Sequence, residues 1–133
     1  MFRETLSLAL PLALLAGCAT TPQTAQGPDP KLTAALEGKV AGKSQSCLPL
    51  DRAVGSEIFH DAILYREGRS RFWLADAPGC GSSSGSNDYI LVQNVYGSQL
   101  CRGDIIRLVE RTGGFTAGAC SVRSFTPYTK PKG

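Results

Sequence analysis

The chain has 133 residues, of which 19% are charged and 42% are hydrophobic, and its formal net charge at pH 7 is +3. A charge this small, with basic and acidic residues interspersed, argues against a nucleic-acid-binding protein and against a tail that binds polyanions. The length suits one small domain, whose hydrophobic core is marginal at this size.

An apolar segment from Leu6 to Leu15 is followed by Ala16-Gly17-Cys18, so small residues stand directly before a cysteine. About ten apolar residues are too few to cross a bilayer of roughly 30 Å as a helix, but they suit the hydrophobic core of an export signal. The whole pattern is that of a lipobox. We therefore expect residues 1–17 to be a lipoprotein signal peptide and the Cys18 thiol to carry a diacylglyceryl group, with fatty acids such as palmitate.

The residue after Cys18 bears on the location of the protein. Ala19 stands where an aspartate would favour retention at the inner membrane, so resemblance to lipoproteins in general implies the outer membrane of a Gram-negative bacterium. Two or three acyl chains anchor a protein stably. We expect a protein lipid-anchored in the outer membrane and facing the periplasm. An ordinary secretory leader with a chance cysteine is the alternative, and both imply export.

Residues 18–30 are expected to form a flexible tether behind the lipidated cysteine, because they are mostly Thr, Gln, Gly, Ala and Pro. Residues 31–133 are expected to form one small β domain. A short helix joins the two parts, with Asp29 as its N-cap and Pro30 in its first turn, and it continues to Leu36.

Short β-prone runs follow the helix. Glu67-Gly68-Arg69-Ser70 separates the first two runs and predicts a hairpin. The spacing leaves no room for helical crossovers between parallel strands, so we predict an all-β fold, a small disulfide-stapled barrel or sandwich. The predicted strands are Ile63–Arg66, Arg71–Leu74, Tyr89–Val95, Asp104–Glu110, Phe115–Val122 and Ser124–Tyr128.

The four remaining cysteines are Cys47, Cys80, Cys101 and Cys120. An even number in an exported domain predicts two disulfides. Of the three connectivities, the preferred one is Cys47–Cys80 with Cys101–Cys120, because each pair brackets a predicted hairpin. A metal site is not expected, since there is no C-x-x-C spacing and His60 is the only histidine.

No sequence motif supports an enzyme or a cofactor. Gly81–Gly85 matches G-x-S-x-G around Ser83, but a nucleophile elbow needs a strand before it and a helix after it. His60 and Asp61 are adjacent, and neighbours on a strand point to opposite faces. Arg102-Gly103-Asp104 is interpreted as a turn into the next strand rather than as an adhesion motif.

Arg66, Arg69 and Arg71 surround the predicted hairpin and are the candidate anion-binding residues, for a glycan or a lipid headgroup. A solvated hairpin tip is the alternative interpretation. The nearby aromatic residues are assigned to the core, with a binding groove as the alternative. These residues are Tyr65, Phe72, Trp73 and Tyr89.

The segment from Gly38 to Tyr128 resembles a family of small, uncharacterised exported four-cysteine proteins and lipoproteins of alphaproteobacteria. The resemblance implies an exported, β-rich domain and transfers no functional residue. The matching residues are Cys47, Cys80, Leu100-Cys101-Arg102-Gly103-Asp104-Ile105-Ile106-Arg107, Gly113-Gly114-Phe115, Gly118-Ala119-Cys120 and Phe125-Thr126-Pro127-Tyr128.

Taken together, these features predict a non-catalytic outer-membrane lipoprotein that acts as a binding or structural module. Its expected partners are the membrane, through the lipid anchor, and an envelope protein or an anionic glycan. An inhibitor of an exported hydrolase is the alternative function, because a disulfide-held scaffold presents a preorganised loop such as Gly79–Asp88.

Overall fold

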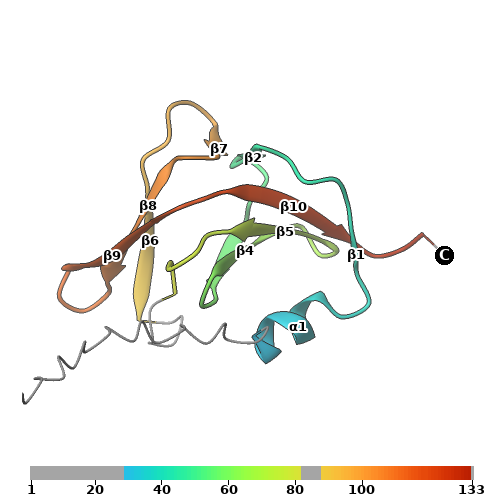
Figure 1. Ribbon diagram of the computed structural model, residues 1–133, viewed down its shortest axis with the longest axis horizontal. Coiled ribbons are helices and arrows are strands. Elements are labelled where there is room, and N and C mark those ends of the chain that lie inside the picture. The colour runs from blue at the N-terminus through green and yellow to red at the C-terminus, as the bar shows by residue number, and fades with distance from the viewer. Residues whose placement is uncertain (1–28, 82–87, 133) are drawn as a thin grey trace, which may run out of the picture.

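The computed structural model describes residues 29–81 and 88–132, which form an all-β domain with one short helix (Figure 1). The predicted fold class is confirmed. The helix is α1 (Pro30–Leu36). The strands are β1 (Val40–Ala41), β2 (Cys47–Pro49), β3 (Gly55–Ile58), β4 (Ala62–Glu67), β5 (Arg71–Asp76), β6 (Tyr89–Gln93), β7 (Gln99–Cys101), β8 (Ile105–Glu110), β9 (Thr116–Ser121) and β10 (Ser124–Thr129).

The strands form three antiparallel sheets in a sandwich-like arrangement. The largest has five strands in the order β1-β10-β5-β4-β3, the second pairs β2 with β7, and the third has the order β6-β8-β9. Figure 1 shows β10 as a long strand that runs from the three-stranded sheet across the domain to β1. Among the described strands no sheet closes on itself, so the sandwich alternative holds and the barrel alternative does not.

The five-stranded sheet is covered on both faces. Its core face packs against the two smaller sheets in a cluster that includes Ile63, Tyr65, Trp73, Leu48 and Ile106. Its helix face packs against α1, where a second cluster is built on Phe59, Ala62 and Leu64. Burial on both sides explains why β4 carries a continuous apolar run rather than an alternating pattern.

The predicted helix is confirmed, and tertiary contacts hold it in place. The Asp29 Oδ1 atom accepts a hydrogen bond of 2.8 Å from the backbone N–H of Lys31, and Pro30 opens the first turn. A helix of 7 residues is marginal in water on its own. Leu32, Ala35 and Leu36 therefore supply the stabilising contacts by packing against the helix-face cluster.

The local turns also follow the sequence. Gly68 has a φ of 66° in the β4–β5 hairpin, a left-handed conformation that glycine adopts without strain. Arg102-Gly103-Asp104 forms the predicted turn, in which the Asp104 carboxylate accepts a 2.7 Å hydrogen bond from the Cys101 backbone N–H. The predicted strands all form, with ends that differ by one or two residues. The short strands β1, β2, β3 and β7 were not predicted.

The preferred disulfide pairing is wrong. The structure joins Cys47 to Cys101, with Cα atoms 4.0 Å apart, and Cys80 to Cys120, with Cα atoms 5.1 Å apart. The reason is the pairing of β2 with β7, which places Cys47 directly opposite Cys101 in the ladder. Two disulfides, as predicted, staple the fold, and they close loops of 54 and 40 residues. In the chain-entropy account each contributes about 4 kcal/mol.

Candidate functional site

Strand register gathers basic residues at one end of the five-stranded sheet. Arg71 pairs with Glu67 and with Thr129, and Thr129 pairs in turn with Val40. The end of β4, the start of β5 and the end of β10 therefore meet at the same edge. We call this region the basic end and define it by Lys39, Arg52, Arg66, Arg69, Arg71, Lys130 and Lys132.

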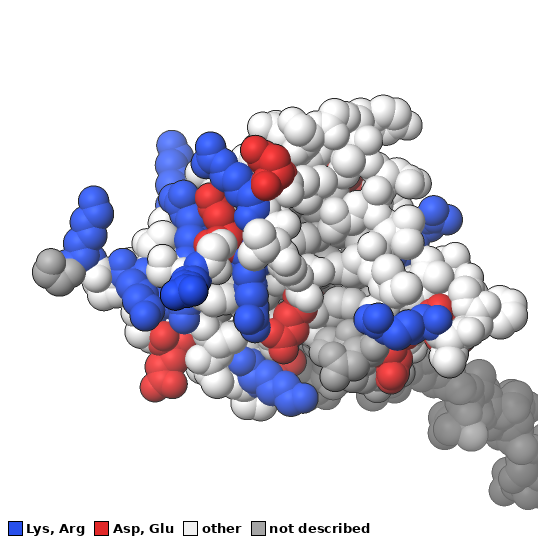
Figure 2. Space-filling model, turned by 180° about the vertical axis from the view of Figure 1, so that it is seen from behind, with Lys and Arg blue, Asp and Glu red and all other residues white. Residues whose placement is uncertain are grey.

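The positive charge of the chain is concentrated there. Figure 2 shows most of the blue side chains of this view on the side that carries the C-terminal tail. The carboxylates of the same region belong to Glu37, Asp51, Glu57 and Glu67, so the region has seven basic and four acidic side chains. This excess equals the formal net charge of the whole chain, which is +3.

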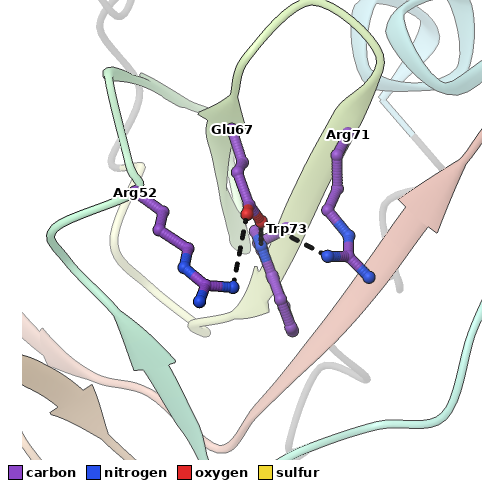
Figure 3. A network of polar contacts seen from close by, with 4 residues as sticks. All are labelled: Arg52, Glu67, Arg71 and Trp73. Atoms are coloured by element: carbon purple, nitrogen blue, oxygen red, sulfur yellow. Dashed lines mark hydrogen bonds and ion pairs between the residues drawn. The ribbon is translucent and has the colours of Figure 1, made fainter.

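A half-buried polar network lies at the core-face side of the basic end (Figure 3). The Trp73 indole Nε1 donates a 2.6 Å hydrogen bond to the Glu67 carboxylate. The Nη1 atoms of Arg52 and Arg71 each lie 3.8 Å from that carboxylate, and the Arg71 guanidinium lies 5.5 Å from the Trp73 ring centre. Glu67 thus positions two arginines and leaves one positive charge uncompensated within the network.

A second group of contacts lies on the helix face. The Phe72 ring centre is 4.7 Å from Lys39 Nζ and 5.9 Å from the Arg66 guanidinium carbon. Lys39 also donates a 2.9 Å hydrogen bond to the Ala35 carbonyl, and Arg66 lies 3.6 Å from the Glu57 carboxylate. Cation–π contacts and ion pairs therefore hold these cations beside the hairpin.

The three arginines selected from the sequence are brought to one end but not into one pocket. Alternation along the strands places Arg66 on the helix face and Arg71 on the core face, while Arg69 lies at the hairpin turn. Sequence reasoning missed Lys39, Arg52 and the C-terminal lysines. They come from segments distant in the chain, and only the strand register brings them to the hairpin.

The aromatic residues near the hairpin are mostly core residues. Trp73 and Tyr65 are buried, and the Tyr65 hydroxyl accepts a 2.6 Å hydrogen bond from Gln93 Nε2 of the three-stranded sheet. Burial raises the pKa of Tyr65 well above its ordinary value, so the phenol stays protonated. Phe72 and Tyr89 are half-buried.

One argument made against a catalytic pair at His60 and Asp61 is wrong. These residues lie in the β3–β4 turn rather than on a strand, and His60 Nε2 is 3.8 Å from the Asp61 carboxylate. Both side chains are about half exposed. Ser83, and the interior of the Gly79–Asp88 segment, lie outside the described residues.

A hollow of about 630 Å³ lies between α1 and the end of β10. Its lining contains one carboxylate, that of Glu37, and one phenol, that of Tyr128. Its lining residues are Pro30, Thr33, Ala34, Leu36, Glu37 and Tyr128.

Within residues 29–81 and 88–132, no three His, Cys, Asp or Glu side chains group as a metal site. No helix in the same ranges is long and apolar enough to cross a membrane. Comparisons with protein families, curated proteins and solved structures find no match. The resemblance to exported four-cysteine proteins therefore stays a prediction.

Proposed function

We propose that the protein is a non-catalytic lipoprotein of the bacterial outer membrane, anchored through Cys18, and that its basic end binds the anionic surface of the membrane. The observation that supports this function best is the concentration of positive charge at one end of the five-stranded sheet. Juxtamembrane basic residues contribute about 1 kcal/mol each near an anionic leaflet.

The predicted tether keeps the domain within reach of this surface. Ten residues, 19–28, lie between Cys18 and Asp29. A flexible chain of that length has a root-mean-square extension of about 18 Å. The domain then stays close to the headgroups, where its charge asymmetry orients the basic end towards them.

Lipidation and surface binding are tested separately. In cells, labelling with a fatty acid and membrane fractionation should mark the wild-type protein, and Cys18→Ala should abolish the label and release the domain. An unlabelled wild-type protein found in the periplasm would contradict the anchor.

In vitro, the mature chain carrying Cys18→Ala should sediment with vesicles that contain phosphatidylglycerol and not with pure phosphatidylcholine vesicles. Arg69→Gln with Lys130→Gln should weaken this binding by about tenfold or more, because each charge contributes about 1 kcal/mol. Neither side chain makes an ion pair in the part of the chain that the structure describes. The control is Arg102→Gln with Arg107→Gln, which removes the same charge elsewhere. Binding to a soluble anionic glycan without binding to vesicles would instead favour the glycan.

A further inference from the structure

The three-stranded sheet turns branched aliphatic side chains away from the core. Alternation places Ile106 and Leu108 of β8 inside, where they are 0% and 2% exposed. Ile105 and Val109 of the same strand, with Ile90 and Val92 of β6, lie on the opposite side. Ile90 is 45% exposed and Ile105 is 50% exposed. We call this surface the outer face and define it by Ile90, Val92, Ile105, Arg107 and Val109.

Arg107 stands at the centre of the outer face. β8 is the middle strand, and Arg107 pairs with Val92 on one side and with Ala119 on the other. Its neighbours along β8 on the same side are Ile105 and Val109. The four residues next to Arg107 on the sheet are thus apolar, and the polar Thr116 and Ser121 of β9 stand diagonally from it.

No carboxylate of the described residues pairs with Arg107. The two acidic residues nearest in sequence point elsewhere. Asp104 accepts its hydrogen bond from the Cys101 backbone, and Glu110 falls on the inner side of β8 by alternation. The contrast with Arg66 and Arg71, which both have a carboxylate partner, is plain.

This composition differs from that of a solvated sheet face. An antiparallel sheet with one side in water places polar residues on that side. Here the outward positions of β6 and β8 are aliphatic apart from Arg107, and the polar Thr116 and Ser121 of β9 lie beside Val109 and Ile105. An arginine ringed by apolar residues is typical of the centre of a protein–protein interface, where it needs an opposing carboxylate once water is excluded.

We infer that the outer face docks an envelope protein that presents a carboxylate within an apolar surface. Charge complementarity selects this occupant. A second copy docked about a twofold axis at the centre of the face would bring Arg107 against Arg107. The tether residues 19–28 carry no charge with which to neutralise it.

The size of the face indicates how the partner is held. Three strands about 4.8 Å apart and about 20 Å long cover roughly 300 Å², below the roughly 800 Å² per partner of a stable complex. Phe115, which is 72% exposed at the β8–β9 turn, extends the apolar area. A small interface suits a partner at the same membrane, where confinement raises the effective concentration. The inference rests on the proposed function in two respects, the confinement by the lipid anchor and the envelope location of the partner.

A photo-crosslinking residue tests the outer face in cells that express the full chain. Benzoylphenylalanine in place of Ile105 should form an adduct with one envelope protein, which mass spectrometry identifies together with its contacted acidic residue. The matched position is Val54, an aliphatic residue that is 76% exposed at the other end of the domain, and it should give no such adduct.

The charge requirement is then tested directly. Arg107→Glu should reduce the adduct at least tenfold, Arg107→Gln should reduce it less, and Arg102→Glu should leave it unchanged. Replacing the partner's acidic residue by lysine should restore the adduct with Arg107→Glu. Unchanged thermal unfolding of each variant shows that the fold is intact.

Several outcomes would overturn the inference. They are the absence of an adduct at Ile105, an equal adduct at Val54, an adduct insensitive to Arg107→Glu, and an adduct with a second copy or with lipid. Fatty-acid labelling of Cys18 reports on the anchor independently. If labelling fails, the adduct formed in purified mixtures with the identified partner still decides the docking face.

Discussion

The basic end and the outer face both display arginine, but the two regions treat it differently. At the basic end, Arg71 lies beside the Glu67 carboxylate and over the Trp73 ring, and other basic side chains lie in the same region. On the outer face, the four residues next to Arg107 are aliphatic. The first arrangement creates a field that extends over about a Debye length, whereas the second creates a contact that matters only after water is excluded.

The difference teaches that charge alone does not define a binding surface. Partnered cations on a mixed surface suit a diffuse anionic surface such as headgroups, because no single contact has to be exact in position. A lone cation in an apolar ring suits one opposing group at one position. The following predictions test whether the basic end and the outer face bind in these two different ways.

The largest expected effect is a difference in stability between substitutions on the two sides of the three-stranded sheet. Leu108→Ala, on the inner side, should lower the free energy of unfolding by about 2 to 5 kcal/mol, because it opens a cavity in the core. Ile105→Ala, on the same strand but on the outer face, should lower the free energy of unfolding by less than about 1 kcal/mol. Chemical denaturation of both variants measures the difference, and equal losses would mean that something in the folded chain already covers the outer face.

Salt should weaken binding at the basic end more than binding at the outer face, because only the first depends on electrostatic attraction over a distance. Raising NaCl from about 0.1 M to about 1 M shortens the Debye length from about 10 Å to about 3 Å. Sedimentation with phosphatidylglycerol vesicles should then fall at least tenfold, whereas the adduct formed through Ile105 should persist. A salt-resistant vesicle interaction would show that apolar contacts, not the basic end, carry the membrane binding.

The stability of the domain should fall at alkaline pH because of Tyr65, whose hydroxyl accepts the hydrogen bond from Gln93 of the three-stranded sheet. Burial raises the pKa of Tyr65 above the ordinary value of about 10 that the unfolded chain has. The unfolded state therefore loses this proton first, so stability is full below about pH 10 and falls above it, by at most about 1.4 kcal/mol per pH unit. Denaturation at several pH values measures the slope. Tyr65→Phe should flatten it, and an unchanged slope would assign the effect to another group.

The smallest effect on stability is expected at Glu67. Glu67→Gln keeps an acceptor for the Trp73 indole but removes the ion pairs to two partly exposed arginines, so it should cost less than about 1 kcal/mol. It also raises the charge of the basic end by one, and vesicle binding should strengthen by about fivefold. Glu67→Ala is the matched variant, which gives the same charge but leaves the indole N–H unpaired. Weaker vesicle binding by both variants would show that Glu67 itself contacts the membrane ligand.

Local features of the fold were predictable from the sequence, and long-range ones were not. The helix cap at Asp29, the β4–β5 hairpin and the alternation of β6 and β8 depend on residues within a few positions of each other. The β2–β7 pair joins segments 54 residues apart through only three residues per strand, and its sequence shows no periodic signal. The preferred disulfide pairing failed for this reason.

The candidate site shows the same limit. Arg66, Arg69 and Arg71 were found because they surround one hairpin, whereas Lys39 and Arg52 join them only through strand register. The outer face could be anticipated in part, since alternation along the predicted strand Asp104–Glu110 separates Ile106 and Leu108 from Arg107 and Val109. That Arg107 lacks a carboxylate partner depends on the placement of acidic residues throughout the described chain, and no local pattern reveals it.

The interlaced order of the disulfides has a consequence for biogenesis. Along the chain, the first cysteine of the domain joins the third, and the second joins the fourth. In the exported protein that we propose, Cys47 and Cys80 reach an oxidising compartment before Cys101. A thiol oxidase that acts on the emerging chain would then join Cys47 to Cys80, and the native pairs would form only by thiol–disulfide exchange. We therefore expect maturation of the proposed exported domain to need an isomerase activity as well as an oxidant.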